Sequence, residues 1–133
     1  MTTTVSASPL VGVGVVIRRG EELLLIKRAK DPNRGLWAVP GGKVRRGEAI
    51  RETGRREVFE ETGLEVEVGD VVWVGEIISD DTHIVLIDLD GVVTGGRLEA
   101  GDDAQDAAWV HRDRLGDYEL TPTMAELIEA VWR

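Results

Sequence analysis

Three glutamates in the middle of the chain have a spacing that suits a metal ion. Glu57, Glu60 and Glu61 stand at positions i, i+3 and i+4, so on a helix their side chains lie on one face. Carboxylates so close together repel each other, and we find no Lys or Arg on the same strip to offset them. We therefore expect Mg²⁺ or Mn²⁺, because hard divalent ions take carboxylate oxygens and fill their remaining positions with water and phosphate.

Glycines and helix-boundary residues flank these acids. Gly41 and Gly42 follow Pro40, so the backbone there can approach a ligand closely: a Gly42 carbonyl could bind metal and Gly41 could contact substrate. Gly47-Glu48 is predicted to open the helix with an acid in its first turn, where the helix dipole favours negative charge. Thr62-Gly63 is predicted to end it, because Gly is the usual residue at a helix C-terminus.

The simplest alternative is that this Glu-rich face is only solvated, as such faces commonly are. However, the stretch from Gly42 to Leu64 reads G-x5-E-x7-R-E-V-x-E-E-x-G-L, so that two glycines, four acids, one arginine and two apolar positions fit one pattern. The pattern resembles the complete signature, or box, of the Nudix hydrolase family. The segments GLWAVPGGK and DDAQDAAWV also resemble this family.

The resemblance implies a reaction and a role for each residue of the box. In Nudix hydrolases the R-E-x-x-E-E segment binds Mg²⁺ or Mn²⁺ ions that bridge the pyrophosphate of a nucleoside diphosphate linked to another moiety, and the phosphoanhydride is hydrolysed. Arg56 matches the arginine that orients a box glutamate through an ion pair, and Glu57 or the neighbouring Glu60 is the candidate base. Glu48 matches a more peripheral acid. The residues implied to hold the metal are Gly42, Glu48, Glu57, Glu60 and Glu61.

Three residues outside the box are further candidates. Asp102-Asp103 precedes Trp109 at a spacing where Nudix enzymes often present a loop carboxylate for the metal or the attacking water; we favour Asp103, with a solvated turn as the alternative. Arg28 resembles a family position near the substrate and could contact phosphate, or it is surface charge. Trp37 is the aromatic residue that we favour for substrate binding, with a core role as the alternative.

One departure from the family pattern lies inside the box. Thr53 and Gly54 stand where relatives commonly carry two small residues, often alanines. Because Gly in a helix interior costs roughly 1 kcal/mol relative to Ala, we expect Gly54 to lie where close packing excludes a side chain. We expect this departure to affect stability more than chemistry.

Composition bounds the remaining possibilities. The 133 residues, of which 42% are hydrophobic, predict a single domain over residues 1–133, with residues 1–8 as a flexible N-terminus. The net charge of −9 argues against a nucleic-acid polymer as partner. The chain has no Cys, no signal-peptide pattern and no apolar run near the ~20 residues that span a bilayer. We therefore expect no membrane partner and a cytoplasmic location.

The pattern of apolar residues predicts an α/β fold. Strands are expected at 10–18 and 21–27 around an Arg19-Gly20 turn, at 36–39, 66–78 and 82–93, and at 107–110, with Gly95-Gly96 turning the chain. Besides the box helix, a C-terminal helix is expected from Thr121 as N-cap and Pro122 as first residue to Trp132. Its apolar face comprises Met124, Leu127, Ile128 and Val131. The family resemblance implies a Nudix α/β/α sandwich, with a mixed β-sheet between helices.

The sequence leaves the substrate open. The leading prediction is a nucleotide-derivative substrate such as ADP-ribose or a nucleotide sugar. The first alternative is a nucleoside triphosphate pyrophosphohydrolase with a sanitising role, including action on oxidised guanine nucleotides. The second is a non-catalytic, nucleotide-sensing Nudix module, although such modules typically lose a box glutamate and this chain keeps all four. The apolar strand at 66–78 favours a homodimer, with burial in the sheet as the alternative.

Overall fold

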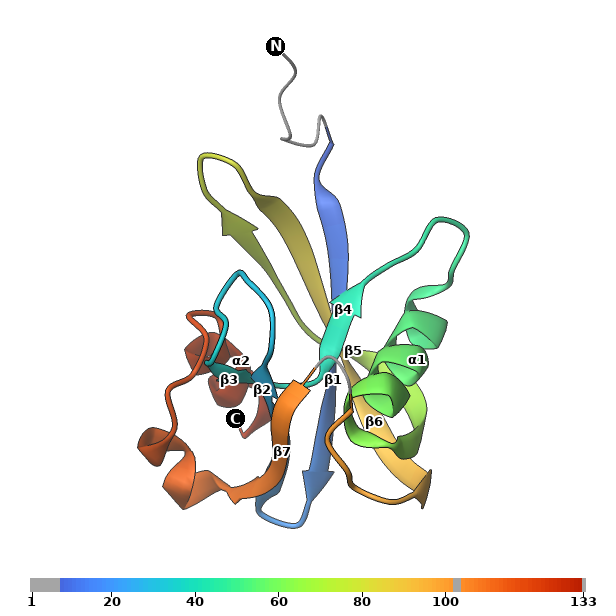
Figure 1. Cartoon of the computed structure of the whole chain (residues 1–133), viewed down its shortest axis with the longest axis vertical. Helices are drawn as coiled ribbons and strands as arrows, with labels where there is room; N and C mark the ends of the chain where they lie inside the picture. The colour runs from blue at the N-terminus through green and yellow to red at the C-terminus, as the bar shows by residue number, and fades with distance from the viewer. Residues whose placement is uncertain (1–7, 102–103, 133) are drawn as a thin grey trace.

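The computed structural model describes residues 8–101 and 104–132. Figure 1 shows the order of the elements along the chain. They are β1 (Leu10–Arg19), β2 (Glu22–Arg28), β3 (Trp37–Ala38), β4 (Gly41–Lys43), α1 (Ile50–Thr62), β5 (Leu64–Ile78), β6 (His83–Gly96), β7 (Ala104–His111), the 3-10 helix η1 (Arg112–Asp117) and α2 (Met124–Val131).

Strand β1 is the centre of a mixed sheet. It pairs in parallel with β6 from Leu10 to Ile17, and antiparallel with β4 and with the start of β2. The order across the sheet is β3-β2-β1-β6-β5, with β4 paired to β1 and β7 paired to β2. The predicted mixed sheet is therefore confirmed. The pairing also places β4, which carries the two box glycines, directly beside β1.

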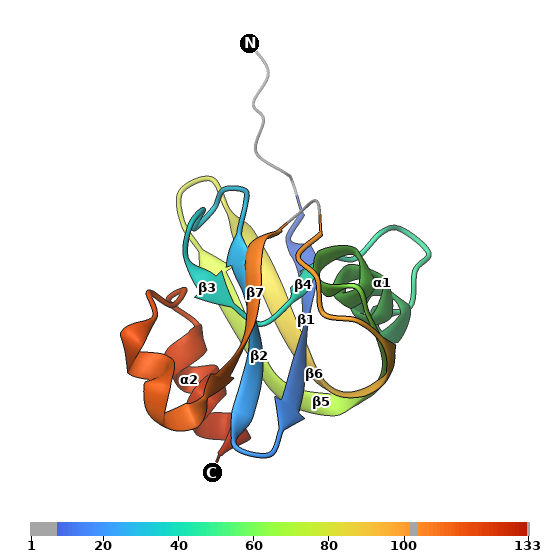
Figure 2. The same cartoon turned by 60° about the horizontal axis from the view of Figure 1, so that its bottom comes forward.

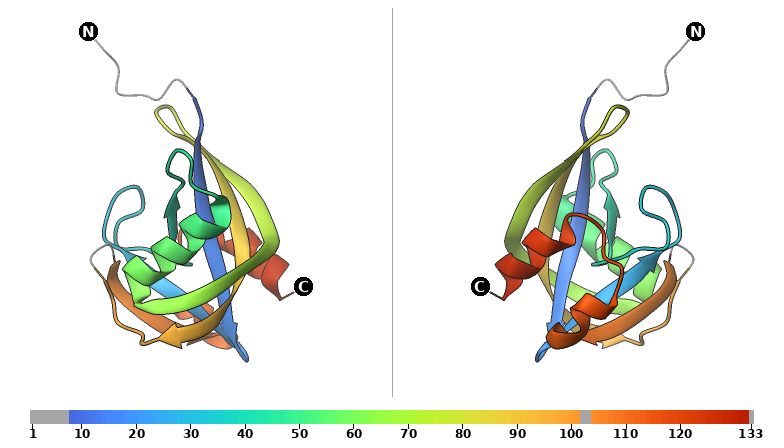
Figure 3. Two further views of the ribbon diagram at one scale, coloured as in Figure 1. Left: turned by 90° about the vertical axis from the view of Figure 1, so that its right-hand side faces the viewer. Right: turned by 90° about the vertical axis from the view of Figure 1, so that its left-hand side faces the viewer.

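The two helices cover opposite faces of this sheet, as the two views in Figure 3 and the view in Figure 2 show. Alternate residues of β1 and β2 supply two cores, because successive side chains of a strand point to opposite faces. On the α1 side the buried residues are Val15, Ile17, Leu24, Val58, Leu64 and Val66. On the α2 side they are Val16, Leu23, Leu25, Val110, Leu115, Met124, Leu127 and Val131. This is the predicted α/β/α sandwich.

Several predicted element boundaries were wrong. Helix α1 begins at Ile50 with Ala49 as N-cap, so Glu48 lies before the helix and not in its first turn. Helix α2 begins at Met124 with Thr123 as N-cap. Leu120 forms a bridge with Trp37 of β3, and the N–H of Thr121 donates to the Trp37 carbonyl oxygen, so Thr121 still belongs to the extended segment before the helix. Gly95-Gly96 does not turn the chain but continues β6 and pairs with the start of β5. The sequence also gave no signal for η1.

Two other expectations about the helices were correct. Gly63 ends α1 in the left-handed conformation, with φ of 75°, and its N–H donates to the Phe59 carbonyl oxygen. Met124, Leu127 and Val131 of α2 are buried in the core. In residues 8–101 and 104–132, no helix is long and apolar enough to span a bilayer.

Candidate functional site

The acidic face of α1 lies directly against the glycines of β4. Glu61 is 4% exposed, and its Oε1 accepts a hydrogen bond from the Gly41 N–H at 2.7 Å. A Cβ at Gly42 would lie 2.5 to 2.8 Å from the carboxylate atoms of Glu57, so only glycine leaves room for that carboxylate. The structure thus brings together Gly41, Gly42, Glu57 and Glu61, which the sequence had grouped.

Arg56 links the remaining box acids. Its Nε and Nη2 donate to Oε2 and Oε1 of Glu48 at 2.8 and 3.0 Å, a two-pronged pair, while its Nη1 donates to Glu57 at 2.5 Å and to Glu60 at 3.4 Å. The expectation that no basic residue shares the acidic strip was therefore wrong. Arg56 precedes Glu60 by one helical turn, and its long side chain reaches both acids.

Glu48 is held by donors from three residues. Besides the two bonds from Arg56, its Oε1 accepts from the Thr53 hydroxyl at 2.7 Å and from the Arg45 N–H at 3.2 Å. These bonds, above all those from Arg56 and then that from Thr53, lower the pKa of Glu48 from 4.5 to about 2. The same contact raises the pKa of Arg56 above its usual value. A metal ion at Glu48 would have to compete with Arg56 for these oxygens.

The donor set fits a hard divalent cation bound by few protein ligands. Among residues 8–101 and 104–132, no three acidic or histidine side chains form a ready-made cage. Mg²⁺ does not require one, because it usually takes one or two carboxylates and completes its shell with water and phosphate oxygens. Glu57 and Glu60 already share one positive charge, that of Arg56. A cation between them is therefore electrostatically favourable.

Three predicted site residues are not brought to the acids of α1 in the described structure: two lie elsewhere in the fold, and the third is outside the described residues. The Arg28 Nε donates to the Pro32 carbonyl oxygen at 2.8 Å. Trp37 packs on the α2-side core and meets Tyr118 edge to face, with ring centroids 5.1 Å apart. In the described part of the chain, the contacts of both side chains are with these neighbours and not with the acids of α1. Asp103 lies outside the described residues.

Sequence reasoning missed two polar residues. Thr53 was noted only for its effect on stability, yet its buried hydroxyl contacts Glu48. Asp88 on β6 is 5% exposed and lies over Gly14; burial raises its pKa from 3.8 to about 6, against the opposing effect of the hydrogen bond from Gly14. An acid at an inward position of the apolar run IVLIDLD was the available signal for Asp88.

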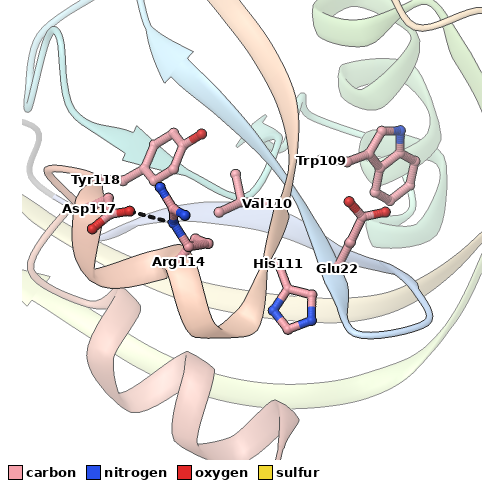
Figure 4. Close-up of a pocket in the computed structure, with 7 residues that line it drawn as sticks. All are labelled: Glu22, Trp109, Val110, His111, Arg114, Asp117 and Tyr118. Atoms are coloured by element: carbon pink, nitrogen blue, oxygen red, sulfur yellow. Dashed lines mark hydrogen bonds and ion pairs between the residues drawn. The ribbon is translucent and has the colours of Figure 1, made fainter.

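No predicted substrate residue lines either of two hollows on the surface formed by residues 8–101 and 104–132. The hollow in Figure 4, of about 490 Å³, lies between β2, β7 and η1. Its lining residues are Glu22, Trp109, Val110, His111, Arg114, Asp117 and Tyr118. A second hollow, of about 600 Å³, lies beside α1, and Glu48 and Arg56 form part of its wall. The outer side of the Glu48–Arg56 pair is therefore reachable from solvent.

Comparison with known proteins agrees with this geometry. The family model of the NUDIX domain matches residues 8–131. The chain belongs to the Nudix family. It is 38% identical over 109 residues to an ADP-ribose pyrophosphatase of Methanocaldococcus jannaschii, covering 80% of this chain and 64% of that protein. It is 35% identical over 123 residues to a putative 8-oxo-dGTP diphosphatase 2 of Mycobacterium tuberculosis, covering 85% and 80%.

Solved Nudix structures share the whole fold. The crystal structure of a MutT NUDIX hydrolase from Burkholderia pseudomallei matches with a TM-score of 0.83 at 31% identity, covering 93% of this chain and 98% of that one. The NUDIX domain of Shewanella oneidensis NrtR, solved with ADP ribose, matches with a TM-score of 0.79 at 19% identity, covering 96% and 88%. The likeness to the second structure shows the fold alone.

Proposed function

We propose that this Nudix chain is a metal-dependent pyrophosphohydrolase that cleaves the phosphoanhydride of a nucleoside diphosphate linked to another moiety. The observation that carries the proposal is the seating of Glu57 over Gly42 and of Glu61 on the Gly41 N–H. This arrangement holds two carboxylates of α1 directly against the backbone of β4, at positions where glycine leaves room for them. A helix whose acidic face is only solvated would not need this contact between its carboxylates and a glycine backbone.

The residues of the site have distinct roles in this proposal. Glu57 and Glu60, with Glu61 behind them, hold one or more Mg²⁺ or Mn²⁺ ions, and the Gly42 carbonyl is a further ligand. The bound metal neutralises charge on the phosphates and lowers the pKa of a bound water. Arg56 keeps Glu57 in place through their ion pair. Glu57 or Glu60 takes the proton of the attacking water, with Asp103 as the further candidate for this role.

ADP-ribose or a nucleotide sugar is the substrate class that we favour. Support comes from the 38% identity to the ADP-ribose pyrophosphatase of M. jannaschii. Oxidised guanine nucleoside triphosphates are the second candidate. They are supported by the 34% identity to a putative 8-oxo-dGTP diphosphatase of Bacillus subtilis and by the M. tuberculosis relative. The matched regions span 64% of the M. jannaschii protein and 65% of the B. subtilis protein.

The products separate the two substrate classes. We would incubate the protein with Mg²⁺ or Mn²⁺ and ADP-ribose, nucleotide sugars, dinucleoside polyphosphates, or normal and oxidised nucleoside triphosphates, and identify the products by chromatography. Cleavage of ADP-ribose yields AMP and ribose 5-phosphate, whereas cleavage of a triphosphate yields a monophosphate and pyrophosphate. Folded protein that binds these nucleotides but turns over none of them would contradict the proposal and support a nucleotide-sensing module.

A matched pair of variants tests the role of the acids. Glu60→Gln keeps the size of the side chain but removes a charge from the proposed metal site. Glu52→Gln makes the same change on the same helix, at an exposed residue whose partner is Arg55 at 3.1 Å. We expect Glu60→Gln to lower turnover by at least about 100-fold and Glu52→Gln to leave it unchanged. Turnover by Glu60→Gln at the same rate as by Glu52→Gln and the wild type would overturn the assignment of the metal site.

A further inference from the structure

The Thr53 hydroxyl is a buried polar group near the start of α1 whose main partner lies outside the helix. Thr53 is fully buried, and its Oγ1 donates to Glu48 Oε1 at 2.7 Å. A threonine inside a helix usually bonds the carbonyl one turn earlier, but here the Ala49 carbonyl oxygen is the more distant acceptor, at 3.3 Å. A hydroxyl has one proton to donate, so the shorter contact with Glu48 is the stronger one.

A continuous series of contacts runs from this hydroxyl to the acids of the site. Thr53 donates to Glu48, and Glu48 accepts from Nε and Nη2 of Arg56. The third guanidinium nitrogen, Nη1, donates to Glu57 and Glu60. The side chains of Glu48, Arg56 and Glu57 are only 12 to 18% exposed. The two-pronged pair fixes the plane of the guanidinium group, because both nitrogens must meet both oxygens. The plane of the Glu48 carboxylate therefore determines the position of Arg56 Nη1, the nitrogen that donates to Glu57.

Glu48 needs such an anchor because it precedes the helix. Glu48 belongs to a turn, in which its N–H donates to the Arg45 carbonyl oxygen at 2.9 Å. The backbone hydrogen bonds of α1 therefore do not fix its position, because the helix begins at Ile50. Without the hydroxyl, Glu48 Oε1 would keep only Arg56 and the Arg45 N–H as donors. The carboxylate could then rotate together with Arg56.

We propose that Thr53 is a positioning residue of this Nudix site: its hydroxyl orients Glu48, and through Glu48 and Arg56 it sets the position of the Glu57 carboxylate. This inference rests on the proposed function for its effect on catalysis, but its structural part can be tested without metal or substrate. Thr53 does not touch the reacting groups.

The first test measures how tightly Arg56 is held in the metal-free protein. Nitrogen-15 NMR gives the rate at which the Arg56 Nε proton exchanges with water, which is slow when the two-pronged bond stays closed. Thr53→Val keeps the shape of the side chain but lacks the hydroxyl, and Thr53→Ser keeps the hydroxyl. We expect exchange in Thr53→Val to be about tenfold faster than in the wild type, as loss of a charge-assisted bond predicts, and Thr53→Ser to restore slow exchange.

A control variant separates positioning from general destabilisation. Thr62→Val removes another buried hydroxyl from the same helix, one that donates to the Val58 carbonyl oxygen at 2.6 Å. We expect it to lower the melting temperature without changing the exchange of the Arg56 proton. If Thr53→Val fails to fold, Thr53→Ala, which introduces the common family residue, replaces it. Unchanged Arg56 exchange in the folded variant would overturn the proposal.

The second test measures metal binding and turnover. Partners that bond a metal ligand directly contribute roughly 10- to 100-fold, and Thr53 is two contacts further away, so we expect Thr53→Val to weaken Mn²⁺ binding and lower kcat by about threefold to tenfold. KM for the nucleotide should stay constant. In a Glu48→Ala background, which removes the acceptor of the Thr53 hydroxyl, the effect of Thr53→Val on Mn²⁺ binding should disappear, because Thr53 acts only through Glu48. An equal effect in both backgrounds would contradict this route.

The outcomes for the two proposals are distinguishable. A protein with no turnover on any substrate, in which Thr53→Val still accelerates exchange of the Arg56 proton, contradicts the proposed function and supports the orienting role of Thr53. An active enzyme whose metal binding, kcat and Arg56 exchange are all indifferent to Thr53→Val supports the function and overturns the inference.

Discussion

The pKa values of two carboxylic acids of the chain are shifted in opposite directions by their surroundings. The pKa of Glu48 falls to about 2 because Arg56 and Thr53 bond its charged form. The pKa of Asp88 rises to about 6 because it is buried and has no cation among the causes of its shift. Glu48 therefore serves as a permanently charged anchor at neutral pH, whereas Asp88 lowers the stability of the folded state when it ionises.

Asp88→Asn is predicted to stabilise the protein at neutral pH. The folded protein binds the Asp88 proton more tightly than the unfolded chain, so the free energy of unfolding decreases as the pH rises from about 4 to about 6 and stays reduced above. The shift corresponds to a cost of up to about 3 kcal/mol. Urea unfolding should show the variant more stable than the wild type by about 1 to 3 kcal/mol at about pH 7.5, with little of this gain left at about pH 4.

Asp90→Asn is the matched control for this prediction. Asp90 lies on the same strand but is half-exposed, with Arg18 at 3.9 Å. Asp90→Asn should not raise the free energy of unfolding more at about pH 7.5 than at about pH 4. A gain for Asp88→Asn that is the same at both would show that its ionisation does not destabilise the fold.

The acids of the box and the ion pair of Arg56 with a box glutamate could be predicted from the sequence, whereas the contacts of Thr53 and Asp88 could not. A spacing of three and four residues on a helix fixes the shared face of Glu57, Glu60 and Glu61 by local geometry alone. The bond from Thr53 to Glu48 depends on how the turn before α1 folds back. The position of Asp88 over Gly14 depends on the register of β6 against β1. Such contacts between distant segments are not encoded in local spacing.

At the scale of elements, the site depends on how closely α1 approaches β4. Gly42→Ala should test this approach, because the added Cβ would lie 2.5 Å from Glu57 Cδ and force the carboxylate to move. We expect turnover and Mn²⁺ affinity to fall by at least about tenfold, as displacement of a metal ligand predicts, while the melting temperature changes little. Gly116→Ala is the control, since a Cβ there meets nothing within 4 Å. Full activity of Gly42→Ala would mean that Glu57 need not sit over β4.

The segment after β6 forms hydrogen bonds with the C-terminal end of α1. The N–H groups of Glu99 and Gly101 donate to the carbonyl oxygens of Thr62 and Glu61 at 2.8 and 2.9 Å, which satisfies acceptors that a helix end leaves open. A Cβ at Gly101 would collide with the Glu60 carbonyl oxygen. Gly101→Ala is therefore predicted to loosen this end of the helix, with a loss of about 1 to 3 kcal/mol in thermal or urea unfolding.

Hydrogen exchange locates the effect of Gly101→Ala. The backbone amides of the last turn of α1 should lose protection in the variant, while those of α2 keep theirs. Uniform loss of protection in both helices would instead indicate global destabilisation without a local role for this segment.

Types of element were easier to predict than their boundaries. The apolar pattern identified both helices and the long strands, and the expectation that Gly54 lies at a close contact is met by Val15, whose Cγ2 would be 2.8 Å from an added Cβ. The start of α2 was misplaced because Thr121 is a good N-cap by type, but Leu120 forms a bridge with Trp37 of β3 and the Thr121 N–H donates to the Trp37 carbonyl oxygen. A tertiary contact here overrides a local preference.

At the scale of the molecule, strand β5 forms an outer edge of the sheet. Val71, Val74 and Ile78 on this strand are 53 to 68% exposed. A long edge strand with apolar side chains can pair with another chain, so the homodimer that the sequence favours stays a prediction. Light scattering over a range of concentrations measures the mass directly.

Neighbouring leucines of one strand join the two cores of the sandwich into a single unit. Leu24 and Leu25 are both fully buried, yet Leu24 packs on the α1 side and Leu25 on the α2 side. Because both layers rest on the same strand, Leu24→Ala and Leu25→Ala should each lower the free energy of unfolding by about 2 to 5 kcal/mol and leave one cooperative transition.

Two spectroscopic probes test whether the layers unfold together. Tryptophan fluorescence reports mainly on the α2 side, where Trp37, Trp73 and Trp132 pack, whereas far-UV circular dichroism reports on both helices. In urea the two signals should change at the same midpoint in the wild type and in both variants. If Leu24→Ala shifted the dichroism and left the fluorescence midpoint in place, α1 with its acids would unfold independently of α2. The site would then be stabilised by its own layer alone, and binding of Mn²⁺ would raise only the midpoint measured by dichroism.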